Sequence, residues 1–185
     1  MRVIAGSARG RRLKELQGMD TRPTTDKVKE SMFNIIQFDI QGRKVLDLFG
    51  GTGQLGIEAL SRGADHCTFV EMRRDALNLM RENLKVTGFT DQARIVPGDA
   101  LAFLSSCREK FDAILLDPPY HTDLLDQCMD AIVMFDILSE HGIMMCESLA
   151  ERQLPEMPES YFEPPRSYRY GQIKLTVFRR KGVKR

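Results

Sequence analysis

The chain has 185 residues, of which 42% are hydrophobic and 29% are charged, a composition typical of a globular domain and not of a disordered or fibrous protein. No apolar run approaches the roughly 20 residues that a membrane helix needs, and no apolar segment of signal-peptide length follows the start of the chain. We therefore expect a single domain, residues 1–185, that works in the cytoplasm and has no membrane partner.

Basic residues gather at the two ends of the chain, although the formal net charge is only +1. Residues 1–14 contain five basic side chains and residues 166–185 contain eight, and neither range contains an acid. The other 14 basic residues share the middle of the chain with all 26 acids. Two basic ends on an acidic body suggest a polyanionic partner, although solvated termini that aid solubility would give the same pattern.

The first element that we expect is a helix over residues 26–37. Its apolar side chains recur at helical spacing and form one stripe: Val28, Met32, Ile35 and Ile36. Thr25 is a candidate N-cap, and Asp26 suits the positive end of the helix dipole. Residues 1–24 then form a short basic N-terminal extension, and residues 25–185 form the core of the domain.

Short apolar strands alternate with helices after Gly42. We expect strands at 44–49, 67–71, 94–96, 112–116 and 143–146, and helices at 54–61, 74–85 and 124–138. Residues 167–170 and 173–179 are typical of a hairpin around Gly171-Gln172. The alternation predicts an α/β, Rossmann-like fold, in which a mostly parallel seven-stranded sheet has helices on both faces and a C-terminal antiparallel hairpin.

The cysteines are far apart in the sequence and form no CxxC pair: Cys67, Cys107, Cys128 and Cys146. This spacing indicates neither a zinc site nor a disulfide framework. We expect buried, reduced thiols and no bound metal.

A glycine loop follows the first strand of the alternating region. Gly51, Gly53 and Gly56 form G-x-G-x-x-G between a strand and a helix, the context in which this motif binds a cofactor. Glu71 ends the next strand, 20 residues after Gly51, where a carboxylate can bind both hydroxyls of a ribose. These features fit a nicotinamide dinucleotide as well as they fit S-adenosylmethionine.

Two further acids favour S-adenosylmethionine. Asp47 lies four residues before Gly51, where it would repel a pyrophosphate at the helix N-terminus but attract the cationic methionine end of the methyl donor. Asp99, in the run Pro97-Gly98-Asp99-Ala100, can accept a hydrogen bond from an adenine amino group. It can equally be the N-cap of the helix that follows, and the two roles are compatible.

Asp117-Pro118-Pro119-Tyr120, the DPPY turn, ends the fourth strand of the alternating region. Proline lacks the N–H that a sheet needs, so the strand cannot continue through this turn. Open α/β sheets bind ligands at the carboxyl ends of their strands, where the turn lies. Hydrogen bonds to the Asp117 carboxylate and the Pro118 carbonyl would orient a nucleobase amine for methyl transfer and stabilise its developing charge. Tyr120 can stack on an extruded base. The alternative is a proline-rich turn with an Asp cap and no chemistry.

The DPPY turn resembles that of methyltransferases that act on nucleobase amino groups. Five further blocks resemble the RsmD family of bacterial 16S rRNA guanine-N2 methyltransferases more closely: IAG at 4–6, RGRRL at 9–13, RPTTDKVKE at 22–30, LDLF at 46–49 and GIEAL at 56–60. The resemblance spans essentially the whole chain. Gly50 and Thr52 stand where the family usually has Ala and Ser.

The resemblance implies a monomeric class I methyltransferase that acts on 16S rRNA, within an assembling or assembled 30S particle, with S-adenosylmethionine as the methyl donor. The residues that it implies for the cofactor pocket are Asp47, Phe49, Gly51, Gly53, Glu71, Met72, Asp99 and Ala100. Those implied for the guanine amine are Asp117, Pro118, Pro119 and Tyr120. Those implied for RNA contact are Arg9, Arg11, Arg12, Arg22, Thr24 and Lys27. Adenine-N6 methylation of DNA or RNA, a dinucleotide-dependent oxidoreductase and a binding-only assembly factor are the alternatives.

Overall fold

The computed structural model describes residues 1–16 and 25–182. The strands in this part of the chain are β1 (Lys44–Asp47), β2 (His66–Glu71), β3 (Ala93–Pro97), β4 (Phe111–Leu116), β5 (Leu138–Leu149), β6 (Arg166–Tyr170) and β7 (Ile173–Arg179). The helices are α1 (Asp26–Ile35), α2 (Gln54–Ser61), α3 (Arg74–Thr87), α4 (Ala100–Ser106), α5 (Leu124–Met134) and the short 3-10 helix η1 (Thr90–Gln92). None of these helices is long and apolar enough to cross a membrane.

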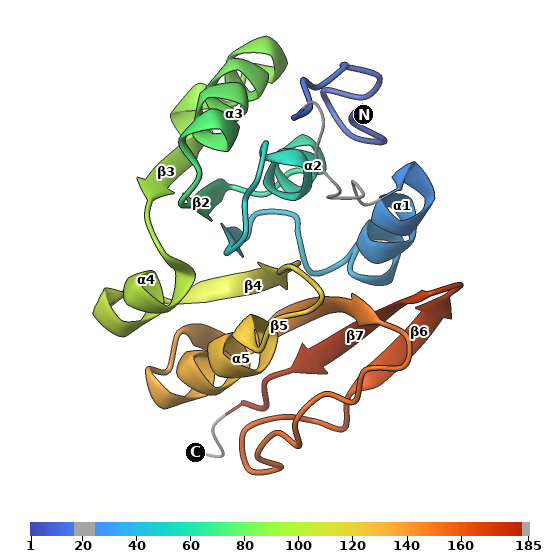
Figure 1. Ribbon diagram of the computed structural model, residues 1–185, viewed down its shortest axis with the longest axis vertical. Coiled ribbons are helices and arrows are strands. Elements are labelled where there is room, and N and C mark those ends of the chain that lie inside the picture. Colours follow the sequence, from blue (N-terminus) through green and yellow to red (C-terminus); the bar gives the residue numbers. More distant parts are fainter. Residues whose placement is uncertain (17–24, 183–185) are drawn as a thin grey trace.

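All seven strands form one sheet in the order β3-β2-β1-β4-β5-β7-β6. The first five strands in this order are parallel, whereas β7 runs antiparallel to β5 and β6 runs antiparallel to β7. Helices α1, α2 and α3 lie on one side of the sheet, and α4 and α5 lie on the other (Figure 1). The predicted Rossmann-like fold with a C-terminal hairpin is therefore confirmed.

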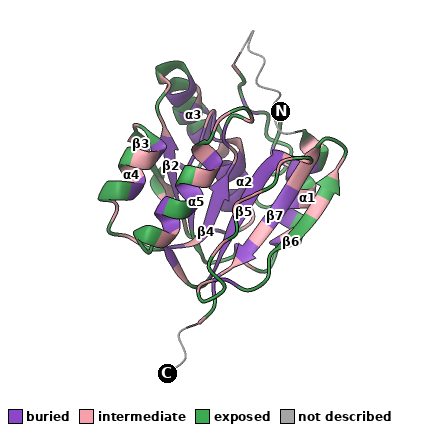
Figure 2. Ribbon diagram, turned by 60° about the horizontal axis from the view of Figure 1, so that its bottom comes forward, coloured by how far each residue is buried: buried purple, intermediate pink, exposed green. Residues whose placement is uncertain are grey.

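Each face of the sheet has its own hydrophobic core. In β4, Ala113 and Leu115 pack with the side chains of the first three helices, and Ile114 and Leu116 pack with those of α4 and α5. Neighbouring side chains of a strand point to opposite faces, so a strand that is covered on both faces is apolar throughout. The central strands are accordingly buried, whereas the outer surfaces of α4 and α5 are exposed (Figure 2).

The prediction of one helix over 124–138 is wrong at its end. Helix α5 ends at Met134, Asp136 has a left-handed backbone (φ 54°), and the chain enters β5 at Leu138. The Ile137 carbonyl accepts a hydrogen bond from Phe111 N–H at 2.9 Å. Ile137 and Leu138 continue the apolar spacing of a helix, but the sheet buries them, and Asp tolerates the left-handed conformation that this change of direction needs.

The N-terminal end of α1 forms as predicted. Thr25 is its N-cap, and the Thr25 Oγ1 accepts a hydrogen bond from Val28 N–H at 3.3 Å. The helix ends at Ile35, slightly before the predicted residue 37.

Three of the four cysteines are buried as expected: Cys67, Cys128 and Cys146. Cys107 follows the last residue of α4 and is partly exposed, so the expectation of burial is wrong there. All four are free thiols.

Gly56 allows α2 to approach β2 closely. A Cβ atom at this position would lie 2.6 Å from Phe69 Cζ and 2.7 Å from Cys67 Sγ. We expect Gly56→Ala to lower the free energy of unfolding by about 2 kcal/mol, because the methyl group overpacks the core. Urea denaturation measures the loss. In a Phe69→Ala background the loss should be smaller, because the contact with Phe69 is gone and the contact with Cys67 Sγ remains; an equal loss in both backgrounds would contradict this explanation.

Candidate functional site

The predicted site residues of four separate segments lie at one edge of the sheet. Asp47 is the last residue of β1 and Glu71 the last residue of β2, and Asp117 directly follows β4. Asp99 follows β3 after one intervening residue. Because these strands are parallel and Asp47 is paired in register with Leu115, their carboxyl ends meet, where ligands of open α/β sheets bind.

The glycine loop turns sharply between β1 and α2. Gly51 (φ 53°) and Gly53 (φ 89°) have left-handed backbones, and Gly53 is the N-cap of α2, so a side chain at either position would be strained. Gly51 N–H donates a hydrogen bond to Glu71 Oε2 at 2.8 Å, and the second Glu71 oxygen accepts one from Arg73 N–H at 2.8 Å. These bonds hold the Glu71 carboxylate beside the loop.

Asp47 is a buried acid beneath the glycine loop. Only 1% of the residue is exposed, and its Oδ2 accepts a hydrogen bond from Gly56 N–H at 2.9 Å. Burial raises the pKa of Asp47 to about 7, and the nearby Glu71 carboxylate adds to this increase. A buried carboxylate without a cation is unfavourable, so this position favours a positively charged ligand group.

Two buried side-chain oxygens have no hydrogen-bond partner among the described residues, and they flank the glycine loop. They are Asp47 Oδ1 and Gln54 Oε1. Buried polar atoms are normally paired, so the two oxygens are candidate acceptors for the polar groups of a ligand. Gln54 was not predicted from the sequence; its amide, directly after Gly53 at the start of α2, was the available signal.

The remaining predicted cofactor residues differ in how far they are exposed. The side chain of Met72 is exposed, with 70% of the residue accessible, and Phe49 is partly buried. Asp99 is the N-cap of α4, and its Oδ1 accepts a hydrogen bond from Ala102 N–H at 2.9 Å, while Ala100 is buried below it. The capping role of Asp99 is therefore confirmed, and the role toward adenine stays a prediction. The described part of the chain contains no cluster of His, Cys, Asp or Glu that could hold a metal ion.

The residues of the DPPY turn differ in how far they are buried. Pro118 is buried, Pro119 is exposed, and Asp117 and Tyr120 are partly buried. The Tyr120 hydroxyl donates a hydrogen bond to Glu147 Oε1 at 2.5 Å, and Glu147 on β5 is only 1% exposed. Glu147 was not predicted from the sequence, because it lies 27 residues from Tyr120 and inside an apolar strand.

The basic N-terminal segment is attached to α2 through a buried acid. The Glu58 carboxylate accepts hydrogen bonds from Ile4 N–H at 2.8 Å and Ala5 N–H at 3.0 Å, and it forms an ion pair with Arg62 at 2.8 Å. The buried Lys29 of α1 donates to the Arg2 carbonyl at 2.6 Å. Three apolar side chains of the segment also join the core: Val3, Ala8 and Leu13.

The predicted RNA-binding cations of this region are exposed. Arg9, Arg11, Arg12 and Lys27 form no ion pair with another described residue. Their charges are therefore available to a polyanion. Arg22 and Thr24 lie outside the described residues.

The cations of the C-terminal hairpin are mostly engaged within the fold. Arg179 forms two hydrogen bonds with Asp39, at 2.7 and 2.9 Å, and the buried Arg180 bonds the Leu138 carbonyl. Lys174 and Lys181 also donate to main-chain carbonyls. Because Arg169, Arg179 and Arg180 form ion pairs with acids elsewhere in the fold, the charge count alone overstated the positive charge that this end presents.

Comparison with known proteins shows similar chains over nearly the whole length. The family described as Conserved hypothetical protein 95 matches residues 1–179. YlbH of Bacillus subtilis (strain 168) is 40% identical over 185 residues, which cover 98% of this chain and 100% of YlbH. Ribosomal RNA small subunit methyltransferase D of Escherichia coli (strain K12) is 33% identical over 180 residues, which cover 97% of this chain and 90% of that protein. A solved structure of the yhhF protein from Escherichia coli has a TM-score of 0.87 and 33% identity, and the superposition covers 99% of each chain.

Proposed function

Because this chain belongs to the RsmD family, we propose that it transfers a methyl group from S-adenosylmethionine to the exocyclic N2 amine of a guanine in 16S rRNA. It would act as a cytoplasmic monomer on an assembling or assembled 30S particle. The observation that carries the proposal is that a buried acid beside the glycine loop, whose Oδ1 has no hydrogen-bond partner among the described residues, and the DPPY turn lie at the same edge of the sheet. The buried acid suits a cationic methyl donor, and the DPPY turn suits an amine.

The residues around the glycine loop would hold S-adenosylmethionine, which supplies an electrophilic methyl group on its sulfonium. Asp47 would bind the ammonium of the methionine end, because its buried Oδ1 has no partner among the described residues. Glu71 would accept hydrogen bonds from the ribose hydroxyls, and Asp99 one from the adenine amino group. The other members of the proposed pocket are Phe49, Gly51, Gly53, Met72 and Ala100.

The DPPY turn would hold the guanine amine. An exocyclic amine is a poor nucleophile because its lone pair is delocalised into the ring. Hydrogen bonds from its two N–H groups to the Asp117 carboxylate and the Pro118 carbonyl would favour a pyramidal nitrogen and stabilise the positive charge that develops there. Tyr120 would stack on the extruded base, a contact that contributes about 1–3 kcal/mol. Pro119 would keep the turn stiff.

Methyl transfer from labelled S-adenosylmethionine to 30S particles, purified from a strain that lacks the enzyme, tests the proposal. Naked 16S rRNA serves as the parallel substrate. Incorporation must exceed that of the Asp117→Ala variant. Nuclease digestion and mass spectrometry of the nucleosides then identify the product, which we expect to be N2-methylguanosine. Methyladenosine would overturn the choice of guanine, and saturable NADH binding without S-adenosylmethionine binding would overturn the choice of cofactor.

The exposed cations of the N-terminal segment should contribute to RNA affinity. Replacing Arg11 and Arg12 with Ala is expected to weaken rRNA binding about tenfold and to reduce the salt slope by about 1–2, since each lost phosphate contact removes roughly 0.7–0.9 from it. Filter binding at several salt concentrations measures both quantities. Arg81→Ala with Lys85→Ala removes two exposed cations from α3 and is the matched control. An unchanged slope in the Arg11 and Arg12 variant would exclude them from the interface.

A further inference from the structure

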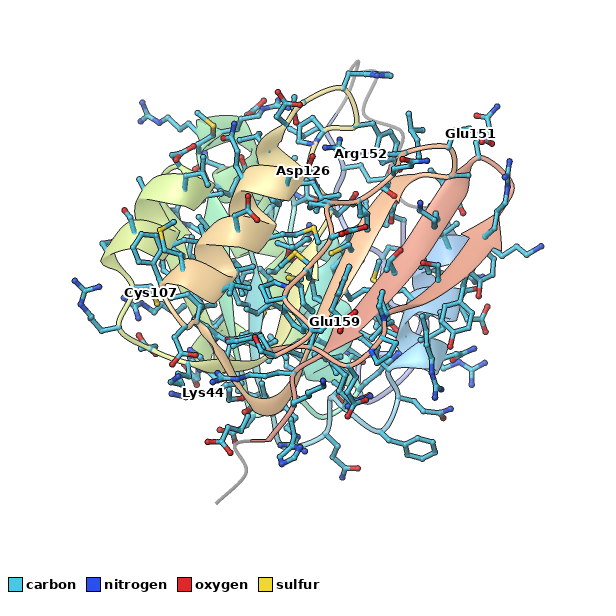
Figure 3. The ribbon with its side chains drawn as sticks, turned by 90° about the horizontal axis from the view of Figure 1, so that it is seen from below. Lys44, Cys107, Asp126, Glu151, Arg152 and Glu159 are labelled. Atoms are coloured by element: carbon cyan, nitrogen blue, oxygen red, sulfur yellow. The ribbon has the colours of Figure 1, made fainter. Side chains whose placement is uncertain are left out.

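Arg152, in the loop after β5, forms hydrogen bonds along the segment that follows the DPPY turn. The Arg152 Nη1 donates hydrogen bonds to the carbonyl oxygens of Tyr120, at 3.4 Å, and Thr122, at 2.9 Å. Its Nη2 donates to Asp126 Oδ1 at 2.9 Å. Figure 3 shows Arg152 beside Asp126, at the first turn of α5. A single side chain therefore connects the last residue of the DPPY turn with the helix that follows.

The Arg152 backbone is itself fixed to the sheet. Arg152 N–H donates to the Leu149 carbonyl at 3.0 Å, and the Arg152 carbonyl accepts a hydrogen bond from Lys174 on β7. Ala150 N–H donates to the Gln172 carbonyl of the hairpin at 2.8 Å. The guanidinium thus extends from a rigid base, and only 18% of the side chain is exposed.

The segment that Arg152 contacts, residues 120–123, has no regular secondary structure to hold its backbone. It belongs to no helix or strand before α5 begins at Leu124, and the N-cap residue Asp123 makes no side-chain capping bond. Thr122 Oγ1 donates to the Pro119 carbonyl at 2.9 Å. Two carbonyls and one carboxylate therefore depend on a single planar group with several donors, a geometry that guanidinium supplies and an ammonium does not.

We infer that Arg152 is a positioning residue for methyl transfer, an inference that rests on the proposed function. Pro118 and Pro119 fix two successive φ angles, so few backbone torsions between Asp117 and Tyr120 can absorb a change. A shift of the Tyr120 carbonyl then moves the Pro118 carbonyl and the Asp117 carboxylate, the two acceptors for the amine. Displacement by about 1 Å from the reactive geometry can lower a rate about 10²-fold. Arg152 acts through the turn and needs no contact with the substrate or the cofactor.

Kinetics of Arg152→Ala and Arg152→Lys on 30S particles test the inference. We expect kcat to fall about 10–100-fold in the Ala variant, while the dissociation constant of S-adenosylmethionine stays within about twofold. The Lys variant should regain only part of kcat. Millimolar guanidinium should raise kcat of the Ala variant but not that of Asp117→Ala. Arg169→Ala, which breaks the exposed pair with Glu151 on the neighbouring hairpin, is the control and should keep kcat. Wild-type kcat in both Arg152 variants would overturn the inference.

Hydrogen exchange separates this inference from the proposed function. In Arg152→Ala the Gln127 backbone amide, which donates to the Asp123 carbonyl at 3.1 Å in the first turn of α5, should exchange faster, while the midpoint of thermal unfolding and the exchange of β4 stay the same. Equal protection in the wild type and both variants would overturn the positioning role. A uniform loss of protection would also overturn it, since Arg152 would then support the whole fold. A wild-type protein that methylates no RNA would overturn the proposed function alone, because the exchange result does not depend on turnover.

Discussion

Replacement of Asp117 by Ala is expected to lower kcat by about 10²–10³-fold, the usual effect of losing one group that stabilises transition-state charge. Its carboxylate would accept a hydrogen bond that strengthens as the amine nitrogen becomes positive. That bond contributes more to the transition state than to the ground state, so its loss appears in turnover. The glycine loop and Glu71, which would bind the cofactor, stay intact in this variant.

Single-turnover methyl transfer and isothermal titration of S-adenosylmethionine, on the same protein, measure the two effects separately. Asp117→Asn is the matched control, because its side-chain oxygen can still accept a hydrogen bond but carries no negative charge. We expect an intermediate kcat for this variant. Equal losses of turnover and cofactor affinity in Asp117→Ala would contradict the role of Asp117 at the amine, because they would place it in the cofactor pocket.

Replacement of Asp47 by Asn is expected to weaken S-adenosylmethionine binding about 10–100-fold, the size of a lost charge-assisted hydrogen bond in a buried site. The buried Asp47 carboxyl has a pKa of about 7 in the ligand-free protein, and only its ionised form attracts the ammonium. In the wild type, affinity should therefore fall by up to about tenfold for each pH unit below 7, since binding requires loss of the proton.

The pH dependence of S-adenosylmethionine binding distinguishes the loss of the Asp47 charge from a change in the shape of the binding site. Isothermal titration between pH 5.5 and 7 should give a sloping profile for the wild type and a flat one for Asp47→Asn. The stability of the ligand-free wild type should depend on pH in the opposite direction from its affinity. The pKa of Asp47 in the folded protein lies above the usual 3.8, so between about pH 4 and 7 the folded protein holds a proton that the unfolded chain has lost. The free energy of unfolding therefore falls as the pH rises through that range. A flat binding profile for the wild type would contradict the ammonium contact.

Secondary structure followed from local patterns wherever both ends of an element carried a signal. Helix α2 has the predicted bounds, from the glycine loop to Ser61, because glycines end the strand before it and apolar spacing identifies the helix. The predicted boundary between α5 and β5 was wrong because the apolar spacing of Ile137 and Leu138 fits either a helix or a strand. Only pairing with Phe111 in β4 decides between them.

The sequence by itself determined the fold class and the edge of the sheet where the site lies. Strand–helix alternation requires parallel strands, and residues that follow such strands share one edge. Tertiary structure decided which charges are free and which side chains hold the site. The engaged cations of the hairpin, the Glu58 contact with Ile4, the Tyr120 contact with Glu147 and the Arg152 contacts with the DPPY segment join residues that are distant in sequence. No local pattern encodes these contacts, because each depends on which surfaces meet when the chain packs.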